Sequence, residues 1–567
     1  MPESTTRRIV TSVLAATCGL SLLLAPACRT PEEYVEEADR DAYALVGAAR
    51  EAAGQAPDPE FSVEAPDRLR DGLLLPRSDE SIPGPRERLA REGGEVTIDL
   101  ASALAIAARN SREFQDQRER LYLTALDLTG RVHDFENNYF GSVSAEAAAN
   151  GDGESDSRVS VAENGSLGFT RLIETGGSFN LNIGQDLSRV ITNPAQTAAS
   201  AFLNLTLSLP LLRGAGREIA FESVTQAERD LLYAVRTYER FKRTFAVDVV
   251  SGYLGLLQSQ QTVENERNNL ERRQLTSEEN KILGEAGRIA RTDVERVNQS
   301  VLAAENRVVV AEQNFESALD RFKITLGLPT DTSLRIDPAD LERLREIGAE
   351  AVDLDETLVT VKALRNRLDF ATAEARVADA GRRVYIARDA LRAGLDFQAS
   401  FGANTNDFAR SSFKLDPLGD TDFSLGLLLD LPLDRVNERN AYRSAIINYE
   451  GTRRDAEAFE DQVKLEARRG LRNLRQAAET YRIQLESLRV AVIYEDAAQL
   501  LKAAGSGSTN DLVDAQNELI QAQNAVLNAL IDYRISRLEL ERDLGILVVG
   551  DDGIDENLTR ELLMQED

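Results

Sequence analysis

Side chains that could carry out catalysis are scarce in this chain of 567 residues. His133 is the only histidine, and Cys18 and Cys28 are the only cysteines. A Ser/His or Cys/His pair therefore has almost nothing to work with, and a zinc site would need carboxylates for most of its ligands, which is uncommon. The run Gly505–Gly507 lacks the Lys that a phosphate-binding loop requires. We expect no enzyme and no cofactor, and we interpret His133 as a residue on a helix surface.

Two carboxylates have a spacing that suits ion binding. Asp511 and Asp514 lie three residues apart at the start of a predicted helix, just after the Gly505–Gly507 turn. Residues three apart share one face of a helix. Repeated by symmetry around an axis, they would form rings that favour cations and bind multivalent ones most tightly. The alternative for Asp511 is that it caps the helix N-terminus, where the backbone dipole stabilises a carboxylate.

The chain repeats itself. Gly287 and Asp293 return as Gly505 and Asp511, and Leu326-Gly327 returns as Leu544-Gly545, both after 218 residues. Other paired runs are Arg109–Phe114 with Arg365–Phe370, and Pro210–Arg213 with Pro432–Arg435. A long module was thus duplicated in tandem, which favours a symmetric shell over a single catalytic cleft.

The N-terminal segment has the features of an export signal. Arg7 and Arg8 precede a mostly apolar stretch, Ile9–Ala25, and small residues follow at a cleavage point. We predict a signal peptide over residues 1–27, so that Cys28 becomes the acylated first residue of a lipoprotein. Ordinary cleavage with a free Cys28 is the alternative. Residues 28–95, rich in Pro, Glu and Arg, are predicted to be a tether with a short helix around Glu36–Glu51.

Alternating apolar and polar residues predict two β segments, at 137–209 and 396–431. Pro210 and Pro432 end them. The turn Thr175–Gly177 predicts an additional hairpin in the first segment, and the pattern leaves open whether this hairpin joins the others or folds to one side.

Helical periodicity covers most of the remaining sequence. A helix is predicted from Ile98 to about Asp134, and very long helices are predicted over 217–283, 292–326 and 438–501. Heptads of apolar residues, with a second stripe of small residues, predict packing against partner helices. One stripe runs Val294, Val301, Val308, Phe315 and Phe322, and its copy runs Leu512, Leu519, Val526, Tyr533 and Leu540.

These patterns give a domain plan of two repeats. The first repeat covers 96–345, with its long hairpin at 217–327. The second covers 346–549, with its hairpin at 436–546. We expect an acidic, frayed tail at 550–567. The formal charge of −29 argues against nucleic acid as a partner.

The combined pattern resembles the TolC family of outer-membrane efflux proteins, from about residue 96 to 546. The resemblance rests on the strand-to-helix junction Leu209–Arg217, the run Ala363–Asp369, the segment Gly505–Gln516, and the end of the last helix at Asp532–Gly545.

This resemblance implies a mainly α fold with a β-barrel portion. Three chains would share a barrel in the outer membrane and continue it as an α-helical tunnel through the periplasm. It also implies docking to a periplasmic adaptor and an inner-membrane RND or ABC pump. By the same resemblance Pro210, Arg213, Pro432 and Arg435 mark strand–helix junctions, Gly287, Gly505 and Gly507 mark hairpin tips, and Asp293, Asp511 and Asp514 line the periplasmic aperture.

One departure concerns the closure of the tip. Some members latch it with a Tyr and an Arg, and Lys502 and Gly507 stand at the matching positions here. A periplasmic coiled-coil scaffold lipoprotein without a pore is the alternative from another class. The paired strand segments discriminate against it, because a scaffold does not need them.

Overall fold

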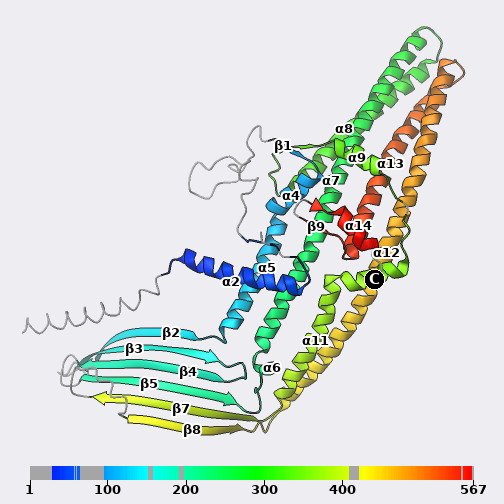
Figure 1. Cartoon of the computed structure of the whole chain (residues 1–567). Helices are drawn as coiled ribbons and strands as arrows, with labels where there is room; N and C mark the ends of the chain where they lie inside the picture. Colours follow the sequence, from blue (N-terminus) through cyan, green and yellow to red (C-terminus); the bar gives the residue numbers. More distant parts are fainter. Residues whose placement is uncertain are drawn as a thin grey trace, which may run out of the picture. The chain divides into compact units, whose positions relative to one another are not determined.

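In a computed structural model, the chain is mostly helical, with one large sheet (Figure 1). The structure describes residues 29–56, 58, 61–63, 95–150, 158–190, 197–350, 352–407, 420–550 and 553–564. The described residues divide into two compact units, and each unit takes segments from both halves of the chain. The units therefore do not coincide with the two predicted repeats.

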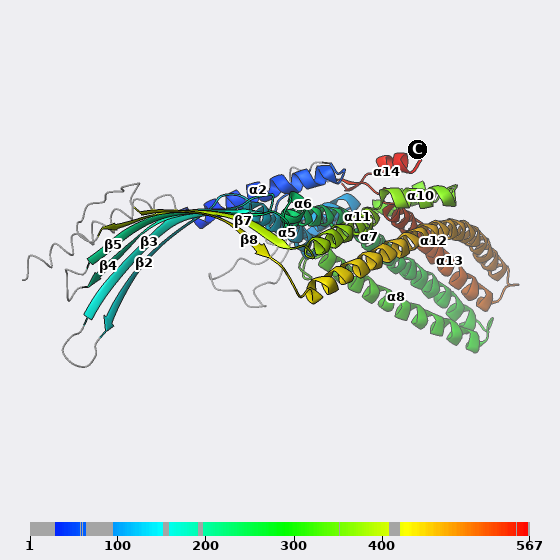
Figure 2. The same cartoon turned by 90° about the horizontal axis from the view of Figure 1, so that it is seen from below.

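The first unit contains a six-stranded antiparallel sheet in the order β2-β3-β4-β5-β7-β8. Its strands lie side by side in both ribbon views (Figures 1 and 2). The strands are β2 (Asn138–Asn150), β3 (Arg158–Leu172), β4 (Ser178–Val190), β5 (Thr197–Pro210), β7 (Gly394–Asp407) and β8 (Asp420–Asp430).

Helix α2 (Pro31–Ala52) belongs to the same unit and overlaps the helix predicted at Glu36–Glu51. Thr30 caps its N-terminus, and Pro31 stands at the start, where it costs no hydrogen bond. Tyr43 packs against Tyr122 at 5.6 Å between ring centroids, and the Tyr122 hydroxyl donates to Asp39 at 2.5 Å. This part of the predicted tether is therefore an ordered helix with specific contacts.

The second unit consists mainly of helices, with two short β pairs. Its elements are β1 (Glu95–Ile98), α4 (Leu100–Asn110), α8 (Arg291–Thr325), β6 (Ser333–Ile336), α9 (Ala339–Ile347), α10 (Glu356–Asn366), α13 (Thr509–Asp543), β9 (Val549–Gly550), β10 (Gly553–Ile554) and α14 (Glu556–Met564). Four helices pass through the boundary between the units: α5 (Arg112–His133), α7 (Glu222–Glu285), α11 (Leu368–Asp389) and α12 (Val436–Ala503). The short α6 (Arg217–Ala220) precedes α7.

Helix lengths recur between the halves. Helices α4 and α5 have 11 and 22 residues, and α10 and α11 have the same lengths. Helices α8 and α13 each have 35 residues. No helix among the described residues is long and apolar enough to cross a membrane.

The second unit has an apolar core where α12 and α13 meet. Leu471 and Leu474 of α12 pack with Tyr533 and Leu540 of α13 and with Phe370 of α11. The heptad stripe predicted on α13 is buried at Leu512, Leu519, Tyr533 and Leu540. On α8 the small-residue stripe is the more buried one, since Ala304 and Ala311 are buried while Val301 and Phe315 are half-buried.

Two predictions about segment ends were wrong. Ile98 does not begin a helix: it lies in β1, paired in register with Ile336, and Asp99 then caps α4 through the Ser102 amide at 2.8 Å. The predicted helix to Asp134 is also interrupted at Ser111, between α4 and α5.

The tail is not frayed over its described residues. Its helix α14 buries Leu563 against the α12–α13 core, and the Thr559 hydroxyl accepts a hydrogen bond from the Val548 amide at 3.1 Å. The acidic composition of the tail obscured the few apolar residues that anchor it.

Candidate functional site

The sheet has two chemically different faces. Residues opposite one another on adjacent strands share a face, so the strand register defines rows of side chains across the sheet. One row crosses all six strands and is wholly apolar or aromatic: Tyr139, Phe169, Leu181, Leu205, Phe401 and Phe423. The next row adds Leu167, Ile183, Leu203 and Ala403. Much of this face is exposed, with 76% of Tyr139, 69% of Leu167 and 68% of Phe423 accessible.

The opposite face is mainly polar, with Phe140 and Phe202 lying over Gly168 and Gly184 as exceptions. The row adjacent to the aromatic one is Asn138, Thr170, Asn180, Thr206, Ser400 and Ser424. Hydroxyl pairs link neighbouring strands on this face, at 2.9 Å between the Oγ atoms of Ser142 and Ser166 and at 2.7 Å between those of Ser400 and Ser424.

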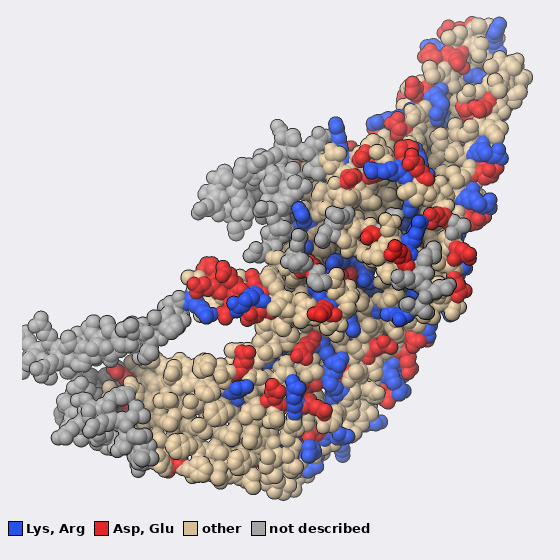
Figure 3. Space-filling model, viewed as in Figure 1, with Lys and Arg blue, Asp and Glu red and all other residues tan. Residues whose placement is uncertain are grey.

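An apolar face of this extent is unfavourable in water. Large contiguous apolar patches are therefore rare on soluble proteins, and where they occur they mark interaction surfaces. The side of the sheet turned to the viewer in Figure 3 has few charged residues, whereas Lys, Arg, Asp and Glu are scattered over the helices. An apolar outer band with a polar inner face is typical of strands in a transmembrane barrel wall.

The first predicted junction fastens the end of β5 to its neighbours. Pro210 is the last residue of the strand, and the Arg213 guanidinium donates to Asp430, at the end of β8, at 2.8 Å. The Gly214 amide donates to the buried carboxylate of Asp389 at 2.7 Å. Gly214 has φ +80°, a conformation that glycine adopts without strain.

The second junction is built in the same manner after β8. Arg435 donates to the Pro432 carbonyl at 3.0 Å and also to the Leu391 carbonyl. The Asp434 carboxylate accepts from the Val436 amide at 3.1 Å, at the first residue of α12. In both junctions an arginine satisfies acceptors at the point where strand becomes helix.

The two hairpin tips have equal turns. Residues 286–290 connect α7 to α8, and 504–508 connect α12 to α13. Gly287 and Gly505 have φ +71° and +73°, as expected for residues that end a helix in the left-handed conformation. At Gly507 a Cβ would lie 2.7 Å from the Lys502 amide nitrogen, so the turn leaves no room for a side chain.

The caps of the two tips differ. On α13, the Ser508 hydroxyl accepts from the Asn510 amide at 3.0 Å, and the Asp511 carboxylate accepts from the Ser508 amide at 3.3 Å, which forms a capping box. The α8 N-cap is Ala290, which makes no such bond, and Asp293 lies in the first turn. The capping role considered for Asp511 is therefore present in the structure.

The predicted aperture residues Asp511 and Asp514 are exposed, and the Asp511 carboxylate accepts its hydrogen bond from Ser508 of the same turn. At the same tip, α12 contacts α7 through the Lys502 ammonium and the Glu279 carboxylate at 3.2 Å. Lys502, at a position where some TolC-family members carry a latch residue, thus pairs within its own chain.

A buried arginine organises the Asn366–Asp369 run. Arg367 is 2% exposed and donates to Asp369 at 2.9 and 3.1 Å and to Glu466 of α12 at 2.5 Å. Arg240 of α7 adds an ion pair to Asp369 at 3.2 Å. Burial alone would raise the pKa of Asp369, but the hydrogen bonds from Arg367 and the charge of Arg240 lower it below its ordinary value. The cluster therefore joins α7, α11 and α12 through charges.

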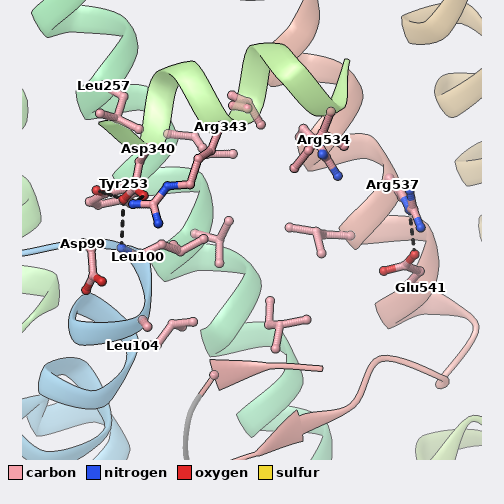
Figure 4. Close-up of a pocket in the computed structure, with 18 residues that line it drawn as sticks. Asp99, Leu100, Leu104, Tyr253, Leu257, Asp340, Arg343, Arg534, Arg537 and Glu541 are labelled. Atoms are coloured by element: carbon pink, nitrogen blue, oxygen red, sulfur yellow. Dashed lines mark hydrogen bonds and ion pairs between the residues drawn. The ribbon is translucent and has the colours of Figure 1, made fainter. Parts of the chain in front are cut away.

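A pocket of about 320 Å³ lies among α4, α7, α9 and α13. On one side Asp340 accepts from the Tyr253 hydroxyl, the Arg343 guanidinium and the Leu100 amide (Figure 4). The pKa of Tyr253 is raised mainly by burial and, to a smaller extent, by the hydrogen bond to Asp340. On the α13 side, Arg537 pairs with Glu541 at 3.0 Å. Arg534 is 93% buried, and its Nε and Nη2 atoms find no hydrogen-bond partner among the described residues.

Cys28, the predicted lipidation site, lies outside the described residues. His133 lies at the end of α5 and is exposed, as predicted. No cluster of three or more potential metal ligands occurs in the parts of the chain that the structure describes.

Comparison with known families finds a match in the second half of the chain. Residues 359–545 match the model of a family described as outer membrane efflux protein. This segment is an outer membrane efflux protein domain. It contains α11, both strands of the second half, α12 and α13, and it agrees with the resemblance to TolC-family channels seen in the sequence. A search among curated proteins found no match.

Solved outer-membrane channels share the fold over most of this chain, well beyond the efflux protein domain. The channel OprN is similar with a TM-score of 0.56 and 16% identity, covering 79% of this chain and 89% of its own. The CmeC channel of Campylobacter jejuni has a TM-score of 0.57 and 14% identity, and the match covers 82% of this chain and 89% of CmeC. CusC has a TM-score of 0.58 and 14% identity, and the match covers 85% of this chain and 99% of CusC. At these identities the likeness establishes the fold.

Sequence reasoning missed two features of this region. Arg240 and Glu466 complete the Arg367 cluster, yet nothing near either residue in the chain marks it as a partner. Arg534 could have been noticed, because it directly follows the heptad residue Tyr533 and so lies next to the buried stripe of α13.

Proposed function

We propose that the chain is the outer-membrane channel of a tripartite efflux or type I secretion system, a passive exit duct without enzymatic activity. The observation that carries the proposal is the sheet, which has one continuous apolar face and one mainly polar face. The same chain also contains two long helical hairpins, which begin with α7 and α12. The efflux protein domain at 359–545 supports it independently.

The duct is a homotrimer. The edge strands β2 and β8 lack partners within the described chain, and unpaired backbone groups facing lipid cost several kcal/mol each. Four long helices per chain would give twelve around a threefold axis, enough for a hollow cylinder. The sheets of the three chains close the barrel in the outer membrane, and the hairpins form the tunnel in the periplasm.

The duplication is part of this proposal. Equal helix lengths in the two halves support it, and so does the matched position of two glycines. Gly327 packs on the carbonyl of Asn110 and Gly545 on that of Asn366, each just after a long helix. Because each chain contains two similar units, three chains place six similar units around the axis, and the helical wall has approximate sixfold symmetry.

The working partners are a periplasmic adaptor and an inner-membrane RND or ABC pump, which meet the hairpin tips at Gly287, Gly505 and Gly507. Asp293, Asp511 and Asp514 line the periplasmic aperture, and Cys28 carries acyl chains that anchor the N-terminus in the outer-membrane lipid. Two or more acyl chains give stable anchoring where one is marginal. The cargo is selected by the pump and adaptor.

Conductance in planar bilayers tests the proposal. A purified trimer should conduct after its tip is opened by substitution, and its mass in detergent should equal three chains. A folded protein that never conducts would favour the periplasmic scaffold, and a stable monomer would exclude the shared barrel. Failure of a palmitate analogue to label the wild type, with the Cys28→Ser variant as reference, would exclude the lipid anchor alone.

A further inference from the structure

The hairpin β3–β4 raises the question of how many strands each chain contributes to a barrel. We infer that all six strands enter the wall, so that three chains build an eighteen-stranded barrel with a wide polar lumen. This rests on the proposed function, and it adds the width of the passage and the size of cargo that can leave.

Register is the first support. Strand β4 pairs with β5 from Ser178↔Ser208 to Arg189↔Thr197, nearly the full length of both strands. Strand β3 pairs with β4 over a similar length. A hairpin that folded aside would leave β5 unpaired on that edge, so the pairing makes the hairpin an integral part of the sheet.

Polarity is the second support. The apolar row does not stop at β5 but continues through Leu181 of β4 and Phe169 of β3 to Tyr139 of β2. The polar row continues in parallel through Asn180 and Thr170. If only the outer strands faced lipid, apolar side chains on β3 and β4 would have no function, and Leu167 would be exposed to water at 69% of its surface.

The turn of the hairpin is the third support, because it is fitted to the junction beside it. A Cβ at Gly176 would lie 2.3 Å from the Gly214 carbonyl oxygen. The Gly216 amide donates to the Thr175 carbonyl at 2.9 Å, and Arg217 pairs with Glu174 at 3.1 Å. The hairpin is thus fixed at the same end of the sheet as the strand–helix junction.

Six antiparallel strands also suit closure between copies. Successive strands alternate in direction, so β2 and β8 at the two edges run opposite to each other. When copies are placed around an axis, β8 of one chain meets β2 of the next in antiparallel orientation. Every edge is then paired, as a wall in lipid requires.

The strand number sets the width. With strands about 4.8 Å apart and tilted by about 40°, eighteen strands give a barrel roughly 36 Å across between backbones, whereas twelve would give roughly 24 Å. Inward side chains remove about 10 Å in either case, half the spacing of packed sheets on each wall. The lumen would then be roughly 26 Å wide rather than 14 Å, enough for two helices side by side. The barrel therefore admits cargo as large as a polypeptide hairpin.

Matched cysteine variants on two paired strands test the wall. Leu181→Cys and Asn180→Cys on β4 stand opposite Leu205→Cys and Thr206→Cys on β5. Each variant is labelled at its new cysteine with an environment-sensitive nitrobenzoxadiazole dye. The labelled protein is then placed in phosphatidylcholine vesicles, and its fluorescence is compared between vesicles with and without brominated acyl chains. The unsubstituted chain gives the background from native cysteine.

We expect equal quenching by brominated lipid at positions 181 and 205 and none at 180 and 206. Quenching at 205 but not at 181 would place the hairpin outside the wall and overturn the inference while leaving the channel intact. Absence of quenching at both 181 and 205 would overturn the channel itself.

Size exclusion gives a second readout. Thr206→Cys should react, from the outer side, with maleimide-linked polyethylene glycol of about 20 Å hydrodynamic diameter, which a twelve-stranded lumen would exclude. Leu205→Cys on the lipid face is the matched control and should not react. Reaction of Thr206→Cys with only the smallest reagents would contradict the wide lumen.

Discussion

The two halves of the chain share a helical framework and differ in what they add to it. Helices α8 and α13 are equal in length, and a glycine after each packs on a helix end of its own half. Yet, in the described part of the chain, the first half gives four strands to the six-stranded sheet and the second half gives two, and the family model matches residues 359–545 of the second half. Close packing holds the helices to one geometry, whereas in the proposed trimer a sheet that closes between copies would gain a hairpin without disturbing the helical walls.

The halves also differ in how they satisfy polar groups. The second half has a capping box at its tip, and its Arg367 lies at the centre of an ion cluster with Asp369 and Glu466, to which Arg240 of the first half adds a pair with Asp369. In the first half the tip has no side-chain cap, and Ser111 stands where Arg367 stands in the second. At these two matched places the second half makes polar contacts that the first half lacks, and substitutions there should show the difference.

The largest contrast is expected at the helical seam. Leu519→Asp places a charge at a buried position between Ala491 and Ala522, and should cost about 3–5 kcal/mol and abolish trimer assembly. Val301→Asp, at the matched position, is half-buried within the chain and should cost less in folding. Thermal unfolding and detergent mass measure both. If the two substitutions lowered the unfolding temperature equally, the helix contacts around Leu519 and Val301 would not differ in burial as described.

The paired glycines should behave alike. Gly545→Ala forces a Cβ to within 2.6 Å of the Asn366 oxygen at φ +72°, and Gly327→Ala brings one to 2.1 Å from the Asn110 oxygen at φ +73°. Each substitution should lower the free energy of unfolding by about 1–3 kcal/mol. Gly505→Ala is the control, since its φ is +73° but no atom lies within 4 Å. A smaller loss at Gly545 than at Gly505 would show that the packing is looser than described.

The ion cluster predicts a pH difference between the halves. The pKa of Asp369 is lowered in the folded state, so its stabilisation is fully present above the ordinary value and is lost as pH falls through the folded value. Asp369→Asn should cost roughly 1–2 kcal/mol at neutral pH, allowing for its partial exposure, and should weaken the acid dependence of unfolding below about pH 4. Glu113→Gln, its exposed counterpart, should change neither.

Arg534 offers a test with the opposite sign. An uncompensated buried guanidinium is unfavourable, so Arg534→Met should raise stability by about 1 kcal/mol. The matched residue in the first half, Glu316, is exposed, and Glu316→Met should have little effect. Lower stability in Arg534→Met, measured by denaturant unfolding, would show that the guanidinium is satisfied in the assembly.

The smallest expected effects concern the tips. Asp511→Asn combined with Asp514→Asn should relieve block by periplasmic trivalent cations and lower cation selectivity in single-channel recordings, with the trimer intact. Asp511→Asn alone keeps a good cap and should barely affect stability. Unchanged block in the double variant would assign Asp511 to capping alone, and the structure already supports that role.

Periodicity and turn chemistry let the sequence determine most of the elements. The alternation that ended at Pro210 and Pro432 placed the strands, and heptads placed the long helices, because these patterns record which side of an element is buried. Motif order also indicated the family. Local pattern failed at Ile98 and at the tail, where a short parallel pairing and a few anchoring leucines depend on residues far along the chain.

Tertiary structure alone decided how the elements combine. No local signal could say that β3 and β4 join the sheet of β7 and β8, because the two parts of the sheet are joined by the pairing of β5 with β7, in which Ala199 stands opposite Asp407, 208 residues further along the chain. The same is true of the Arg367 cluster, in which Glu466 pairs with Arg367 and Arg240 pairs with Asp369, each from another helix. Only the fold brings such residues within hydrogen-bonding distance, since a charge or a strand edge is satisfied by neighbours in space, whatever their separation along the chain.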